Sequence, residues 1–112
     1  MANKYGAKKI EIDGHVFPSK RESEYYLVYK DMLENGEIVG LELQPCFTLI
    51  PPFTNWAGKK VRPCHYTADF KLTYPDGRQK IIEVKGFRTR DYVLRRKMFE
   101  YKYPQYEFEE VH

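Results

Sequence analysis

The sequence is 112 residues long, enough for one domain with a modest hydrophobic core and too short for two, so we expect a single domain over residues 1–112. No apolar stretch approaches the ~18 residues that cross a bilayer, and the first residues lack the apolar region of a signal peptide. These features exclude a membrane-spanning protein and predict a cytoplasmic one. The net charge is only +3.

Turn, cap and periodicity signals divide the chain into short elements. In chain order they predict an N-terminal β-hairpin around Asp13-Gly14, a helix, three strands, a second helix and a final strand. The ranges are 9–12 and 15–17 for the hairpin, 19–34 for the first helix, 40–50, 64–73 and 80–86 for the strands, 90–103 for the second helix and 106–109 for the last strand. Residues 51–60 are predicted to form a loop. After the hairpin, the order α-β-β-β-α-β predicts an α/β fold with a mixed sheet flanked by helices.

Two strands of the predicted sheet carry acidic residues that the connecting turn brings together. Pro75-Asp76-Gly77 is typical of a three-residue hairpin loop. With that loop, Asp69 lies directly opposite Glu83, and Glu83 and Lys85 point to the same face. Opposed carboxylates repel each other unless a cation lies between them, which indicates a metal site. A two-residue Asp76-Gly77 loop would instead put the acids on different faces, and an ordinary surface hairpin is the other alternative.

Glu22, near the start of the first helix, is a candidate third acid. Ser19-x-x-Glu22 matches a capping box, in which Glu22 binds the Ser19 amide and has a purely structural role. On a helical wheel, however, Glu22 falls within about 40° of the centre of the apolar face, whereas Glu24 is about 120° away. A carboxylate that faces the core is unfavourable unless it is paired or near a metal, so we favour Glu22 for the site. The expected apolar face comprises Tyr25, Tyr26, Val28, Tyr29, Met32 and Leu33.

Positive charge is concentrated in the second half of the chain. Residues 57–112 carry thirteen Lys and Arg against eight Asp and Glu, and the densest run extends from Lys85 to Lys97. Such a run is usually a solvated face, but directly after a suspected metal site it indicates a surface that contacts a phosphate backbone. Trp56 and the cations of the predicted loop are further candidates for DNA contact, with burial of Trp56 over the core as the alternative.

Five short motifs span nearly the whole chain. They are Phe17-x-Ser19-Lys20-x-Glu22, Leu43-Gln44-Pro45-x-Phe47, Tyr66-x-Ala68-Asp69-Phe70, Glu83-Val84-Lys85-Gly86 and Tyr103-Pro104. In this order they resemble the PD-(D/E)XK nucleases, and more narrowly a family of small phage and prophage proteins similar to endonuclease I-type Holliday junction resolvases. One departure is that Thr67-Ala68 precedes Asp69, where the superfamily's name implies a proline directly before the Asp. The resemblance implies a restriction-endonuclease-like αβββαβ core.

The resemblance also implies a cofactor and residue roles. Asp69 and Glu83, with the Val84 carbonyl, would bind one Mg²⁺ or Mn²⁺. Glu22 would complete that site or hold a second metal, and Lys85 would orient or help deprotonate the attacking water. The expected catalytic residues are therefore Glu22, Asp69, Glu83 and Lys85. The expected DNA-binding residues are Lys20, Lys59, Lys60, Arg62, His65, Arg88, Arg90, Arg95 and Arg96.

By this resemblance we expect an Mg²⁺-dependent endodeoxyribonuclease of phage or prophage origin, acting in the bacterial host cytoplasm on branched or Holliday-junction DNA. The alternatives are a nicking or restriction-like nuclease on duplex DNA, or a catalytically silent DNA-binding module. One metal cleft per chain and the two-fold symmetry of a junction favour a homodimer. The candidate interface residues are Tyr101, Tyr103 and Tyr106, and the alternative is a monomer in which these tyrosines cover the sheet.

Overall fold

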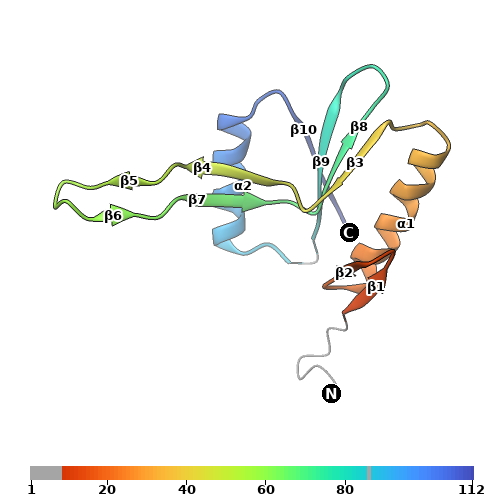
Figure 1. Cartoon of the computed structure of the whole chain (residues 1–112), viewed down its shortest axis with the longest axis horizontal. Helices are drawn as coiled ribbons and strands as arrows, with labels where there is room; N and C mark the ends of the chain where they lie inside the picture. Colours follow the sequence, from red (N-terminus) through yellow and green to blue (C-terminus); the bar gives the residue numbers. More distant parts are fainter. Residues whose placement is uncertain (1–8, 86) are drawn as a thin grey trace.

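The computed structural model describes residues 9–85 and 87–112, and Figure 1 shows how the elements are arranged. The helices are α1 (Lys20–Glu34) and α2 (Arg90–Lys102). The strands are β1 (Ile10–Ile12), β2 (His15–Phe17), β3 (Gly40–Leu43), β4 (Cys46–Ile50), β5 (Phe53–Thr54), β6 (Lys60–Val61), β7 (Cys64–Thr67), β8 (Phe70–Thr73), β9 (Gln79–Val84) and β10 (Glu107–Val111).

A four-stranded mixed sheet in the order β10-β9-β8-β3 forms the centre of the molecule. Strand β9 pairs antiparallel with β8 and parallel with β10, and β8 pairs antiparallel with β3. Parallel neighbours require a crossover connection, which α2 provides between β9 and β10. The predicted α/β fold, with its mixed sheet and N-terminal hairpin, is confirmed. Gly86, the last residue of the predicted third strand, lies outside the described residues.

Each face of the main sheet is covered by one helix and its own hydrophobic cluster. The buried residues on the α1 side are Phe17, Tyr26, Tyr29, Ile38, Phe70, Leu72 and Ile82. Those on the α2 side are Phe47, Leu49, Tyr66, Ala68, Ile81, Tyr92 and Phe99. Because side chains alternate along a strand, Ile81 and Ile82 fall in different clusters, and Glu83 follows Ile81 toward the α2 side.

Two of the predicted strands are broken in the structure, and the breaks create a projecting β arm, residues 46–67. The predicted strand 40–50 divides into β3 and β4 at Gln44, which has a φ of 49°, and at Pro45. The predicted strand 64–73 divides into β7 and β8 at Ala68-Asp69. Strand β4 then pairs with β7 instead of the main sheet, and the predicted loop contains the β5–β6 pair. In Figure 1 the β arm extends past α2, with β5 and β6 near its end.

The first helix begins at the predicted cap, Ser19, and the second is capped by Thr89. Ser19 Oγ accepts a hydrogen bond from Glu22 N (3.1 Å), and Thr89 Oγ1 accepts one from Tyr92 N (3.1 Å). The apolar face of α1 is narrower than predicted, because the sheet covers the Tyr26 and Tyr29 side and leaves Val28 53% and Leu33 39% exposed. Within the described ranges, neither helix is long and apolar enough to cross a membrane.

Candidate active site

Strands β8 and β9 pair in the register that closes a three-residue loop. Tyr74 N donates to Arg78 O (2.9 Å), and Gly77 has a φ of 93°, a left-handed conformation that glycine adopts without strain. One residue beyond the last ladder pair, this register places Asp69 across from Glu83. The predicted register is confirmed, and the two-residue alternative is wrong.

Three carboxyl groups meet at this end of the sheet, from α1, from β9 and from the residue before β8. Glu22 and Glu83 are only 5% and 6% exposed, and Asp69 is half-buried. Asp69 Oδ2 accepts a hydrogen bond from Val84 N (2.7 Å), and the Tyr66 hydroxyl donates to Glu83 Oε1. Glu22 Oε2 is buried and has no hydrogen-bond partner within the described part of the chain. A buried oxygen without a donor is unfavourable, so helix capping alone does not account for this Glu22 carboxylate.

The close approach of these carboxyl groups raises two pKa values. Burial, followed by the neighbouring Glu22 carboxyl, raises the pKa of Asp69 to about 7. Burial, followed by the charge of Asp69, raises the pKa of Glu83 to about 7, although Tyr66 and Lys85 act in the opposite direction. The raised pKa values mean that the hydrogen-bond donors of the protein do not fully compensate the negative charge of these carboxylates. A cation that supplies the missing positive charge therefore binds favourably at this site.

The donor atoms of this carboxylate cluster fit a hard divalent cation. As the side chains stand, no three His, Cys, Asp or Glu residues in the ranges 9–85 and 87–112 are positioned to hold a metal ion. Asp69 and Glu83 each direct one oxygen to a protein donor instead. Mg²⁺ and Mn²⁺ nevertheless prefer a few carboxylate oxygens completed by water, and Glu22 Oε2 is an acceptor that no described residue uses.

Lys85 lies beside Glu83 on the same face, as predicted. Its Nζ atom is 3.6 Å from Glu83 Oε2 and 4.2 Å from the centre of the Tyr92 ring. The sequence assigned no role to Tyr92 or to Tyr66, whose hydroxyl binds Glu83 from β7. Strand alternation predicts that residues 66 and 69 point to opposite faces, so it gives no reason to place Tyr66 at the site. The one available signal was that Tyr66 belongs to the Tyr66-x-Ala68-Asp69 motif.

The expected DNA-binding residues fall into separate groups. Lys20 is exposed at the start of α1, and three cations are exposed near the end of the β arm: Lys59, Lys60 and Arg62. His65 was expected among the DNA-binding residues, on the strand that leads into Asp69. Its Nδ1 instead lies 3.3 Å from Thr48 Oγ1 on β4, because the β arm leaves the sheet before Asp69.

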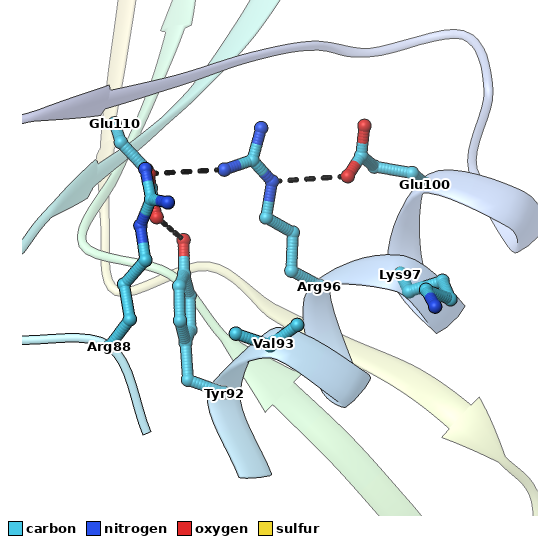
Figure 2. A pocket seen from close by; sticks show the side chains of 7 residues that line it. All are labelled: Arg88, Tyr92, Val93, Arg96, Lys97, Glu100 and Glu110. Atoms are coloured by element: carbon cyan, nitrogen blue, oxygen red, sulfur yellow. Dashed lines mark hydrogen bonds and ion pairs between the residues drawn. The ribbon is translucent and has the colours of Figure 1, made fainter. Parts of the chain in front are cut away.

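Arg88 and Arg96 form an ionic cluster with the buried carboxylate of Glu110, although the Arg88 side chain itself is 59% exposed. Both arginines pair with the Glu110 carboxylate, whose side chain is 6% exposed, and the Tyr92 hydroxyl donates to it (2.6 Å), as Figure 2 shows. Burial would raise the pKa of Glu110, but the hydrogen bonds from Tyr92 and Arg88 outweigh it and lower that pKa. These side chains line a cavity of about 410 Å³. The two arginines therefore tie α2 to β10, a role that the sequence did not predict.

The remaining cations of α2 are less constrained. Arg95 donates to the His65 carbonyl oxygen and pairs with Asp91 (2.9 Å), so part of its charge is compensated. Arg90 and Lys97 form no ion pair among the described residues. Together with Arg88 they border a hollow of about 270 Å³. The basic surface is thus narrower than the sequence predicted.

Two exposed aromatic residues stand apart from the core. Trp56 is 97% exposed at the end of the β arm, so the alternative in which it covers the core is wrong. Of the three tyrosines expected at a dimer interface, Tyr101 is 89% exposed. Tyr103 and Tyr106 instead pack beside Phe99 within the chain's own core.

Comparison with known proteins identifies a family without supplying an activity. The chain matches no curated protein and no solved structure. A family model described as "Protein of unknown function (DUF1064)" matches residues 2–111, which is nearly the whole chain. The chain therefore belongs to the DUF1064 family.

Proposed function

We propose that this protein is a metal-dependent endodeoxyribonuclease. The observation that carries the proposal is the cluster of Glu22, Asp69 and Glu83, in which a buried Glu22 oxygen has no partner among the described residues and Lys85 lies at the edge. Two raised carboxyl pKa values and an adjacent ammonium group are expected where a cation and a phosphate are to be bound together. The order and spacing of these residues also resemble the PD-(D/E)XK nucleases.

In the proposed mechanism, the three carboxylates would hold Mg²⁺ or Mn²⁺, with the Val84 carbonyl as a further ligand. The metal, when bound, lowers the pKa of a water molecule and stabilises negative charge on the phosphate. Val84 N holds one Asp69 oxygen, and the Tyr66 hydroxyl holds one Glu83 oxygen, so both acids are oriented before metal arrives. Lys85, restrained by Glu83 and the Tyr92 ring, orients the attacking water and offsets charge on the scissile phosphate.

Branched DNA, such as a Holliday junction, is the proposed substrate, and the protein would act as a homodimer in the cytoplasm of a bacterial host of the phage or prophage. The substrate and the origin rest on the family resemblance. The dimer rests on symmetry, because a two-fold-symmetric junction is cut on paired strands by two metal clefts. Tyr101 is the tyrosine left exposed for such an interface.

Cleavage of defined DNA substrates tests the proposal. Purified protein is incubated with labelled linear, nicked and four-way DNA, with Mg²⁺ and with EDTA. We expect Mg²⁺-dependent strand cleavage, fastest on the four-way substrate. Faster cleavage of linear duplex would favour a restriction-like or nicking enzyme, whereas binding without cleavage in Mg²⁺ and in Mn²⁺ would indicate a DNA-binding module.

Glu22 and Glu24 form a matched pair for testing the third acid. Glu22→Gln keeps a side chain that can close a capping box, so the midpoint of thermal unfolding should stay within a few degrees of wild type. Cleavage should fall by about 100-fold or more, because a neutral amide is a poor ligand for Mg²⁺. Glu24→Gln, at an exposed position, should cleave normally. Normal turnover by Glu22→Gln would remove Glu22 from the site.

The basic face of α2 is tested by the salt dependence of DNA binding. Each lost phosphate contact should flatten the slope of log K against log [salt] by about one unit. Arg90→Ala/Lys97→Ala should therefore flatten the slope by about two units. Arg88→Ala/Arg96→Ala should flatten it less and destabilise the fold, because Glu110 loses both of its cationic partners. An unchanged slope in Arg90→Ala/Lys97→Ala would place this face away from DNA.

A further inference from the structure

The end of the β arm is a hydrogen-bonded turn that presents one aromatic side chain to solvent. Asn55 Oδ1 accepts hydrogen bonds from Ala57 N and Lys59 N (both 3.0 Å), and Asn55 N donates to Lys59 O (2.9 Å). Gly58 closes the turn with a φ of 78°. Trp56 lies within this hydrogen-bonded turn, yet its side chain is 97% exposed. The Asn55 side chain and backbone hydrogen bonds hold the turn without the indole, so Trp56 contributes little to the fold.

The charge around Trp56 is of one sign. Between Glu42 and Asp69 the sequence contains no Asp or Glu, although the whole chain has 16. The same stretch carries Lys59, Lys60 and Arg62, all exposed beside the turn. Among the described residues these three cations form no ion pair, and a cationic surface of this kind attracts a polyanion. The strand pairing holds Lys60 opposite Thr54, two residues from Trp56. An exposed indole surrounded by cations matches the combination with which proteins bind nucleic-acid bases and backbone together.

The β arm begins directly beside the carboxylate cluster. Gln44 N donates to Asp69 O (2.9 Å) and Ala68 N donates to Pro45 O (3.0 Å), so the residues that flank the two ends of the arm are held together beside Asp69. Trp56 and Asp69 are separated by thirteen positions in the sequence. An extended strand of that length spans at most about 43 Å, which equals the length of about 12 base pairs of DNA. In Figure 1 the β arm runs away from the main sheet along nearly its whole length.

We propose that the β arm binds DNA and that Trp56 stacks on an unpaired base, with Lys59, Lys60 and Arg62 holding the flanking phosphates. This inference rests on the proposed function for the identity of the nucleic acid, and it names what the enzyme recognises. In an intact duplex the base faces are already stacked, and opening a step costs a few kcal/mol. An unpaired base offers a free face, so Trp56 selects DNA that contains a bulge, gap or branch within about one helical turn of the scissile phosphate.

The test uses Trp56 as its own probe, because it is the only tryptophan in the chain. The full-length protein is titrated in EDTA, where metal-dependent cleavage cannot occur. The two probes are a duplex of about 30 base pairs and the same duplex with a central two-nucleotide bulge. We expect stronger quenching of tryptophan fluorescence by the bulged duplex. Trp56→Ala should weaken bulge binding by about ten-fold and leave duplex binding nearly unchanged, whereas Trp56→Phe should retain part of the preference.

A matched control is Phe87→Ala, which removes another exposed aromatic side chain, one that lies outside the β arm, and should keep the bulge preference. Equal affinity of wild type and Trp56→Ala for the bulged duplex, without quenching, would overturn the inference even if cleavage occurs. Quenching without cleavage in Mg²⁺ would support the β arm's role while contradicting the nuclease. The alternative occupant is a second copy of the chain. A blue shift of Trp56 emission as the protein concentration rises without DNA, together with a dimer mass by light scattering, would show that Trp56 binds that copy and would overturn the inference.

Discussion

Asp69→Asn and Glu83→Gln should each reduce DNA cleavage by at least about 1,000-fold while leaving DNA binding equal to wild type or tighter. Each substitution keeps the size of the side chain and removes one negatively charged ligand from the carboxylate cluster. Metal affinity should fall because the site loses charge, and DNA affinity should hold because less negative charge then faces phosphate. Cleavage of four-way DNA in Mg²⁺ and binding of the same DNA in EDTA measure the two effects separately.

Glu24→Gln is the control for this pair as well, since it removes an exposed carboxylate from the same molecule. If Asp69→Asn and Glu83→Gln both keep metal-dependent turnover near that of Glu24→Gln, the assignment of the active site is wrong. Loss of cleavage together with loss of DNA binding would instead indicate that the acids stabilise the DNA-binding surface. Circular dichroism of each variant shows whether the fold is retained.

The metal-free protein should become less stable as the pH rises from about 5 to 8. Burial raises the pKa of Asp69 and of Glu83 to about 7 in the folded protein, compared with about 4 in the unfolded chain, and it is reinforced by Glu22 at Asp69 and by Asp69 at Glu83. The folded state then binds more protons than the unfolded state between these values. The contribution of these two protonated carboxyl groups to the free energy of unfolding is fully present below the unfolded pKa of about 4. It is lost as the pH rises through the folded pKa of about 7. For this pair we expect a loss of about 2–4 kcal/mol, or roughly 10 °C in the unfolding midpoint.

Mg²⁺ should restore that stability at pH 8, because the bound cation compensates the ionised carboxylates and binds only the folded state. Asp69→Asn should raise the unfolding midpoint of the metal-free protein at pH 8, flatten its pH dependence and abolish most of the Mg²⁺ effect. Thermal unfolding in EDTA and in Mg²⁺, from pH 5 to 8, measures all three. Parallel pH profiles for wild type and Asp69→Asn would show that this carboxylate is not the source of the dependence.

The sequence by itself determined the features that depend on neighbours along the chain. Ser19 and Thr89 begin the two helices, and Pro75-Asp76-Gly77 closes the hairpin in the predicted register. A turn of defined length sets the pairing of its two strands, so the opposition of Asp69 and Glu83 followed from three residues of loop chemistry. The inward position of Glu22 followed from the helical period.

Tertiary structure alone decided which of the predicted strands remain continuous. Residues 40–50 and 64–73 each have a strand-like pattern, but Gln44 and Ala68-Asp69 are the points where the chain leaves the main sheet for the β arm. A strand's local pattern does not specify its partner, because β-pairing depends on packing against distant neighbours. For this reason the sequence predicted a loop where the β arm extends, and left open whether Trp56 is buried.

The sequence likewise does not predict which charged side chains pair with each other and which stay exposed. The run from Lys85 to Lys97 predicts a basic surface, yet Arg88 and Arg96 meet Glu110, which lies on a strand that follows the helix. Tyr66 likewise reaches Glu83 from a different strand. Composition counts charges without placing them, and ion pairs between distant residues form only when the fold brings them within a few ångströms. The sequence therefore determined which acids form the candidate site, and the tertiary structure decided which side chains orient them and which cations remain exposed.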